Sequence, residues 1–338
     1  MDIQKNIPSM IANRIKKYGG KPLFQHKVGW SWKQITWLDF EKIIKDIASF
    51  FMSLGFAPGN TALMVSGNRT ESICAEFAIY LIGGISIPIA ENESQDAIVR
   101  IARDSESRFI FVGEESTLNK FRNIKDEIPS LAKIISFSDS SVGEDEKVIP
   151  FKGILKFGSI KRKGLEDELA KTAKGVLSNS PAVVFYNFNS DGRINKKEVT
   201  HRDLVEAIRM ASERLSFINE EDQAFSYLPS VGSFERFVNY LGVYMGIRIT
   251  IAETKEDFFE DILEVKPTVL FEAKSGLENI CSKIISNSGK GSPSQKLRSA
   301  LGGRIKYIFT DSPPRGDIKN LFSKVGTSLI EVPELVGL

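Results

Sequence analysis

This sequence predicts an α/β fold of two lobes, each a mostly parallel sheet flanked by helices. Short apolar runs of strand length alternate with longer amphipathic stretches along nearly the whole chain. Such alternation is typical of parallel strands joined by helical crossovers. A polar, acidic, turn-rich segment, residues 138–146, interrupts the alternation, which then resumes. We place the division near Lys174, so the expected lobes are residues 1–174 and 175–338.

The regular alternation of the first lobe begins with a helix after Thr36. Apolar residues from Phe40 to Leu54 recur at helical spacing, and Gly55 supplies a C-terminal stop. The segments that follow are, in order, the strand TALMV, a helix over Arg69–Ile82, the strand ISIPI, a helix over Gln95–Asp104, the strand RFIFV, a further helix and the strand AKIISF.

The second lobe repeats this pattern without an internal sequence repeat or a coiled-coil heptad run. Its apolar strands are separated by amphipathic stretches of helical period. The expected segments are the strand PAVVFY, a helix over Thr200–Leu215, the strand AFSYL, a helix over Phe234–Met245, the strand IRITIA, a helix over Lys255–Val265, the strand TVLFE, a helix over Lys274–Ile285, the loop SNSGKGSPSQ, and the strands RIKYIF and TSLIEV.

Composition argues against a nucleic-acid partner and against a metal centre. Lys and Arg number 45 against 43 acidic residues, a formal net charge of +2, so no strong positive field is expected. The cysteines, Cys74 and Cys281, and the histidines, His26 and His201, are too scattered for zinc-ligand spacing. Both cysteines lie in apolar, helix-like stretches, which predicts buried thiols in a reducing compartment.

The chain shows no targeting or membrane-spanning segment. Its first residues, MDIQKNIPSM, are polar and lack the apolar core of a signal peptide. The longest apolar stretches, Phe77–Ala90 and Leu241–Ala252, contain glycines and are too short to span a bilayer. We therefore expect a cytoplasmic protein.

The stretch FYNFNSDGRINKKEVTHRDL, from Phe185 to Leu204, is the segment where chemistry is most readily placed. It predicts a strand, a polar turn-forming loop and a helix, and backbone N–H groups at such a turn can face an anion. It contains one glycine, Gly192, and no Walker pattern. Taken alone, these residues favour a connecting loop in which Thr200 caps the next helix.

The same stretch resembles the phosphate loop of adenylate-forming (AMP-binding) enzymes, Y-T-S-G-T-T-G-x-P-K-G-V-x-L-T-H. It aligns without a gap from Tyr186 to His201, and Tyr186, Gly192, Thr200 and His201 match. The intervening positions mostly differ, and Asn195 stands for the family's Lys. The phosphate-binding positions that the resemblance implies are Tyr186, Asn187, Asn189, Ser190, Asp191, Gly192, Lys196 and Lys197.

The resemblance covers nearly the whole chain and is closest to the long-chain acyl-CoA ligases of fatty acid metabolism. NTALMVSGNRTE looks like the family's strand and N-R-P-E turn, and FKGILKFGSI is typical of the long-chain branch. FSYLPSVGSFERF resembles L-S-Y-L-P-L-A-H-I-F-E-R, and KEDFFEDILEVKPTVL resembles E-D-L-x-E-V-K-P-T-V-L. The resemblance implies a truncated large domain that lacks the family's small barrel and C-terminal domain.

Several positions to which the resemblance assigns chemistry are changed. The family's loop Lys, motif His, and Thr and Glu of Y-G-L-T-E correspond to Asn195, Gly232, Val336 and Gly337. Asp191 places a carboxylate where the family has a neutral hydroxyl. At ~4 Å from a phosphate charge and an effective dielectric of ~20, this costs about 4 kcal/mol. The resemblance thus implies no intact catalytic residue, no metal ligand, and no use of the family's ATP, Mg²⁺ and CoA.

Three functions follow from these observations. The first is an inactive homologue that acts by binding a protein partner or a fatty acyl group. The alternative is a fatty acid–CoA ligase that activates carboxylates through an acyl-adenylate, alone or with a second subunit. The third is a module that binds a nucleotide or acyl group without turnover. The sequence leaves the oligomeric state open, and it predicts that residues 187–199 form an exposed, mobile loop because nothing apolar anchors them after Phe188.

Overall fold

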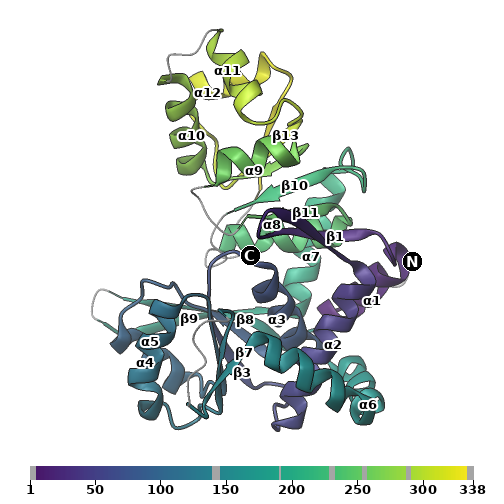
Figure 1. Ribbon diagram of the computed structural model, residues 1–338, viewed down its shortest axis with the longest axis vertical. Helices are drawn as coiled ribbons and strands as arrows, with labels where there is room; N and C mark the ends of the chain where they lie inside the picture. Colours follow the sequence, from purple (N-terminus) through teal and green to yellow (C-terminus); the bar gives the residue numbers. More distant parts are fainter. Residues whose placement is uncertain are drawn as a thin grey trace. The chain divides into compact units, whose positions relative to one another are not determined.

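The computed structural model describes residues 5–138, 145–189, 192–227, 233–252, 257–286 and 291–332. The chain divides into two compact units. Unit 1 comprises Met1–Gly20 and Thr36–Ala207, and unit 2 comprises Lys21–Ile35 and Ile208–Leu338. Each unit is a largely parallel sheet with helices around it (Figure 1), so the predicted α/β class is confirmed.

The sheet of unit 1 has the strand order β7-β6-β5-β3-β4-β8-β9. Every pairing in it is parallel except that of β8 with β9. Its elements are α1 (Ile7–Tyr18), α2 (Trp37–Ser53), β3 (Thr61–Val65), α3 (Thr70–Leu81), β4 (Ile85–Pro88), α4 (Gln95–Asp104), β5 (Phe109–Val112), α5 (Glu115–Ile124), a 3-10 turn (Lys125–Glu127), β6 (Lys133–Ser136), β7 (Val148–Pro150), α6 (Phe151–Gly175), β8 (Pro181–Phe188), β9 (Ile194–Thr200) and the start of α7 (His201–Arg214).

Unit 2 has the order β14-β13-β12-β10-β11-β1-β2. Strand β1 pairs in parallel with β11, and β10 to β14 are parallel to one another. Its elements are β1 (Pro22–Val28), β2 (Ser31–Thr36), β10 (Gln223–Ser226), α8 (Ser233–Met245), β11 (Arg248–Ile251), α9 (Phe258–Val265), β12 (Val269–Phe271), α10 (Lys274–Ser286), α11 (Pro293–Ala300), β13 (Tyr307–Thr310), α12 (Gly316–Ser323) and β14 (Ser328–Glu331).

Helix α2 forms where its sequence signals place it. Thr36 accepts a hydrogen bond from the Asp39 backbone N–H at 3.1 Å, and Asp39 accepts one from the Thr36 N–H at 3.0 Å. This reciprocal capping box satisfies two donors at the helix start. The residues at helical spacing after the cap, Phe40, Ile44 and Ile47 among them, are buried, so the predicted amphipathic face is the core face.

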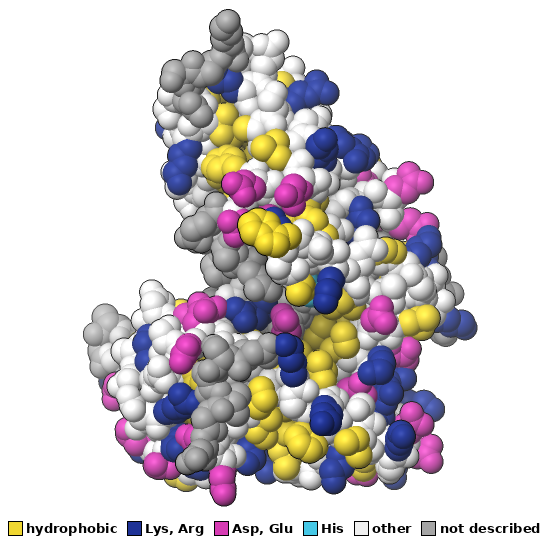
Figure 2. Space-filling view, viewed as in Figure 1, with side chains coloured by type: hydrophobic (Ala, Val, Ile, Leu, Met, Phe, Trp, Pro, Cys, Tyr) yellow, Lys and Arg dark blue, Asp and Glu magenta, His cyan; other side chains and the backbone are white. Residues whose placement is uncertain are grey.

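Helix α6 lies directly against α2, with Gly158 at the contact. A Cβ atom at Gly158 would lie 1.9 Å from the Asp46 carbonyl oxygen, so only glycine permits this approach. Arg162 forms an ion pair with Asp46, Nε to Oδ1 at 3.2 Å. The opposite side of α6 exposes Phe157 and Ile160, and Figure 2 shows hydrophobic side chains interspersed with basic ones on this surface of unit 1.

The division of the chain differs from the one expected near Lys174. Strands β8 and β9 belong to unit 1, because β8 pairs in parallel with β4, with Ser86 opposite Val183, and β9 pairs with β8. Residues 21–35 belong to unit 2, because β1 pairs with β11, with Phe24 opposite Ile249. Strand pairings between distant segments leave no trace in local periodicity, so the sequence could not place this boundary.

Candidate functional site

The stretch predicted to be a phosphate loop is an antiparallel hairpin of β8 and β9. Tyr186 lies opposite Lys196, Asn187 opposite Asn195, and Phe188 opposite Ile194. The expectation of a loop over residues 187–199 is therefore wrong for residues 187–188, which lie in β8, and for residues 194–199, which lie in β9. The sequence signal for β9 is weak, because apolar and polar residues alternate only partly along this strand and several of its residues are charged. Ser190 and Asp191 lie outside the described residues.

The backbone at the hairpin tip is hydrogen-bonded to itself. The Asn189 N–H donates to the Arg193 carbonyl oxygen at 2.9 Å, and the Gly192 N–H donates to the Asn189 carbonyl oxygen at 2.8 Å. Gly192 has a φ of +77°, a conformation in which glycine is favoured because it has no Cβ. Two N–H groups that the sequence placed in an anion cradle are thus used within the turn.

Two polar side chains of the hairpin meet at Asp104, the last residue of α4. The Tyr186 hydroxyl donates to Asp104 Oδ2 at 2.8 Å, and Lys196 Nζ lies 3.2 Å from the same oxygen. The hydrogen bond from Tyr186, with the Lys196 contact, lowers the pKa of Asp104. Burial, followed by the bond to Asp104, raises the pKa of Tyr186 well above its usual range. The structure brings Tyr186 and Lys196 together, but around a carboxylate.

Arg100, one helical turn before Asp104, holds the tip of the hairpin. Its guanidinium donates to the Gly192 carbonyl oxygen at 2.6 Å and lies 4.9 Å from the centre of the Phe188 ring. A cation over an aromatic face adds attraction to the hydrogen bond. Arg100 and Asp104 could not be identified from the sequence as partners of the hairpin. Their spacing of four residues shows that they share a helix face, but no local signal shows that this face meets the hairpin.

The remaining predicted positions are dispersed. Asn187 and Asn195 are exposed and opposite each other, and Lys197, which is half-buried, lies opposite Phe185. The other positions to which the resemblance assigns catalysis, Gly232, Val336 and Gly337, lie outside the described residues, so their roles stay predictions.

The end of the motif is structural. Thr200 accepts a hydrogen bond from the Asp203 N–H at 3.1 Å, so it caps α7 as predicted. His201 is fully buried, and neither ring nitrogen has a hydrogen-bond partner among the described residues. Burial lowers the pKa of His201 to about 4. A neutral imidazole without partners contributes packing, with its ring 6.0 Å from that of Tyr80 in an edge-on arrangement.

The described ranges hold no group of three or more His, Cys, Asp and Glu side chains that could hold a metal ion. Cys74 and Cys281 are buried free thiols, and burial raises the pKa of each. Within the same ranges, no helix is both long and apolar enough to cross a bilayer.

Comparison with known proteins places the chain among adenylate-forming enzymes. The sequence matches the model of the AMP-binding enzyme family over residues 11–331. It is 19% identical over 290 residues to long-chain-fatty-acid–CoA ligase FadD15 of Mycobacterium tuberculosis, covering 85% of this chain and 47% of the relative. It is 20% identical over 307 residues to long-chain-fatty-acid–CoA ligase heimdall of Drosophila melanogaster, covering 87% and 44%. The chain thus spans about half the length of these relatives.

Solved structures show the same fold. A long-chain-fatty-acid–CoA ligase (FadD1) from Archaeoglobus fulgidus superposes with a TM-score of 0.72 at 15% identity, covering 95% of this chain and 60% of that one. The N-terminal domain of FACL13 from Mycobacterium tuberculosis superposes with a TM-score of 0.71 at 13% identity, covering 96% and 75%. With a family match over most of its length and the fold of these solved structures, the chain belongs to the AMP-binding enzyme family.

Proposed function

We propose that this chain is a long-chain acyl-CoA ligase-like domain that does not itself form acyl-adenylates, and that it acts by binding a protein partner or an acyl group. The observation that carries the proposal is the hairpin in the place of the phosphate loop. Its tip is closed by its own hydrogen bonds and held by α4. The family's chemistry requires the opposite, an open cradle facing the triphosphate.

The described part of the hairpin does not fit a triphosphate. Backbone N–H groups bind phosphate only when they are free to donate, and those of Asn189 and Gly192 already donate within the turn. Lys196, a cation that could meet a phosphate, lies 3.2 Å from Asp104 instead. Opening the hairpin would break these contacts together, so bound ATP would have to offset their combined free energy.

The substitutions support the same conclusion. Asp191 adds a negative charge to a loop that would approach phosphates, at a cost of about 4 kcal/mol for a pair ~4 Å apart. Gly232, Val336 and Gly337 offer no hydrogen-bonding side chain where the family has His, Thr and Glu. Removing such groups takes away stabilisation of the transition state, whereas the repulsion from Asp191 weakens ground-state binding.

The second candidate is a fatty acid–CoA ligase that works alone or with a second subunit. It is favoured by the two relatives described above, both of which carry the name long-chain-fatty-acid–CoA ligase and extend over about twice the matched length. In this case the missing catalytic groups would come from residues outside this chain.

Isotope exchange between pyrophosphate and ATP tests the proposal, with hexadecanoate and dodecanoate as acids and the Mycobacterium tuberculosis relative as the positive control. We expect no exchange above a reaction without protein. Exchange by this chain alone would overturn the inactive assignment. Exchange that appears only when a second chain is added would favour the two-subunit ligase.

A further inference from the structure

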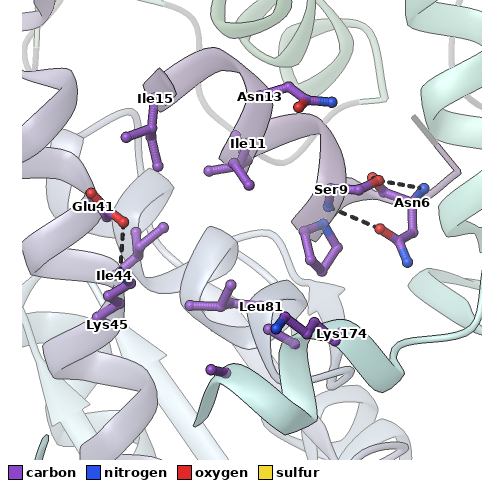
Figure 3. A pocket seen from close by; sticks show the side chains of 14 residues that line it. Asn6, Ser9, Ile11, Asn13, Ile15, Glu41, Ile44, Lys45, Leu81 and Lys174 are labelled. Carbon is purple, nitrogen blue, oxygen red and sulfur yellow. Dashed lines mark hydrogen bonds and ion pairs between the residues drawn. The ribbon is translucent and has the colours of Figure 1, made fainter. Parts of the chain in front are cut away.

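A cavity of about 630 Å³ lies within unit 1, between α1, α2, α6 and the end of α3 (Figure 3). Its volume falls in the range of about 300–1,000 Å³ that is usual for small-molecule sites. None of its residues belongs to β8, β9 or α4, so it is separate from the hairpin. It is lined by Asn6, Pro8, Ser9, Ile11, Ala12, Asn13, Ile15, Glu41, Ile44, Lys45, Leu81, Ala170, Ala173 and Lys174.

The walls of this cavity are mainly apolar. Ile11 and Ile15 of α1 face Ile44 of α2 and Leu81 of α3 across the space in Figure 3. Helix α6 contributes small side chains, among them Ala170, which leaves the space open on that side. Such walls favour a hydrocarbon chain, because apolar surface gains free energy when it is removed from water.

The side chains that line the cavity carry one more positive than negative charge. Glu41 and Lys45 neutralise each other, with Nζ 2.6 Å from Oε1. Lys174 has no ion-pair partner among the described residues, and its side chain extends toward Leu81 in Figure 3. Two lysines against one glutamate leave a net charge of +1 on the lining. An ammonium beside an apolar space complements a ligand with one anionic end.

A side-chain hydrogen bond joins two of the helices that form the cavity. The Asn6 side chain donates through Nδ2 to the Val176 carbonyl oxygen at 2.7 Å, which ties the start of α1 to the end of α6. Asn6 also accepts a hydrogen bond from the Ser9 N–H at 2.9 Å and so caps α1. These contacts fix the start of α1 relative to the end of α6 at one end of the cavity.

We infer that this cavity binds an amphiphile with a single hydrocarbon chain and one anionic end, of the fatty carboxylate class. The chain lies along the isoleucines and Leu81, and the anionic end pairs with Lys174. The inference rests on the acyl-binding part of the proposed function, for which it names the site and the ligand chemistry. It does not depend on whether the chain is catalytically active.

Calorimetry with dodecanoate below its micellar concentration tests the site. Ala170→Trp should fill the cavity and weaken binding at least tenfold. Lys171→Trp is the matched control, because Lys171 is the next residue, is also exposed and does not line the cavity. Lys174→Glu should weaken binding of dodecanoate by a similar factor, whereas Lys171→Glu should leave it unchanged. Dodecan-1-ol should bind at least tenfold more weakly than dodecanoate, and dodecyl phosphate separates a requirement for carboxylate from one for any anion.

The outcomes separate the site from the function. If wild type binds dodecanoate and neither Ala170→Trp nor Lys174→Glu weakens this binding, the ligand does not bind in this cavity. The proposal that the protein binds an acyl group would then still hold. If wild type does not bind dodecanoate, the site and the acyl-binding part both fail, and partner binding remains. Should Ala170→Trp fail to fold, a photoreactive diazirine analogue of dodecanoate on wild type decides. Labelling of α1 and α6 peptides supports the site, and labelling confined to other peptides overturns it.

Discussion

His201 is a residue whose surroundings exclude the acid–base chemistry that a histidine otherwise offers. Its imidazole is fully buried at the start of α7, and burial lowers its pKa to about 4. A general base must lie within hydrogen-bond reach of the proton that it removes, and His201 reaches no polar group among the described residues. The protonation of His201 should therefore affect the free energy of unfolding and not catalysis.

We predict that His201 makes unit 1 less stable as the pH falls from 6.5 toward 4. The unfolded state binds a proton near pH 6.5 and the folded state only near pH 4, so the unfolded state gains protons over this window. The contribution of His201 to the free energy of unfolding is present above pH 6.5 and is lost below it. The loss between pH 7 and pH 5 is about 2 kcal/mol. Urea unfolding of wild type and His201→Leu at both pH values measures it.

The quantity to compare is the difference in the free energy of unfolding between wild type and His201→Leu at each pH. A difference is needed because Glu272 of unit 2 changes stability with pH in the opposite direction. Burial raises the pKa of Glu272 to about 8, with the charge of Asp311 adding to the shift, so its contribution is lost as the pH rises from 4.5 through 8. This effect is common to wild type and variant and cancels. An equal pH dependence in wild type and His201→Leu would contradict the prediction.

At the scale of elements, the close contact of α2 and α6 depends on one glycine. Gly158→Ala should destabilise the protein by about 2–3 kcal/mol, because the added Cβ meets the Asp46 carbonyl oxygen, which belongs to a helix backbone and cannot move alone. Gly164→Ala, on the same helix, has nothing within 4 Å of its new Cβ. It should stabilise by up to about 1 kcal/mol through helix propensity.

Urea unfolding monitored by circular dichroism separates these two substitutions. We expect Gly158→Ala to lower the free energy of unfolding and Gly164→Ala to raise it. A similar small effect of both would show that α6 shifts away from α2 at little cost, and that the contact does not determine the position of α6.

The conformation of the hairpin of β8 and β9 depends on contacts with a distant helix as well as on its own sequence. Its first strand was predicted from the apolar run PAVVFY, and its second strand was missed. Two contacts decide its conformation, from Asp104 to Tyr186 and from Arg100 to Gly192, and they span 82 and 92 residues.

At the scale of the whole molecule, the two units share one strand succession. The orders β4-β3-β5-β6-β7 and β11-β10-β12-β13-β14 both read second, first, third, fourth, fifth along the chain. In such doubly wound sheets, ligands usually bind beyond the carboxyl ends of the first and third strands. Both units thus share one sheet topology, and whether this chain binds a nucleotide is a separate property that can be measured.

We predict that ATP binds this chain very weakly or not at all, because Asp191 opposes the phosphates and the hairpin is closed. The double substitution Asp191→Thr with Asn189→Gly should restore part of the binding. It removes the repulsion and allows closer approach of the backbone, with a gain of up to about 4 kcal/mol, less where salt screens the charge. Calorimetry on both proteins, with and without Mg²⁺, measures it.

Arg193 and Lys197 are basic residues of the same hairpin, and they bear on the outcome. Tight ATP binding by the wild type would mean that such residues compensate Asp191 or that Asp191 points away, and would favour a nucleotide-binding module. Absence of any gain in the double variant would show that the closed hairpin prevents ATP binding without a contribution from Asp191.

The sequence by itself determined the α/β class, most of the helices and strands, and the family, because these depend on local periodicity, capping residues and ordered motifs. It also indicated Thr200 as the cap of α7. Only the tertiary structure decided the boundary of the units, the pairing of β1 with β11, the meeting of Arg100 and Asp104 with the hairpin, and the cavity between α1 and α6. These features join segments far apart in the chain, where pairing and packing energies select the partner and local sequence carries no record of it.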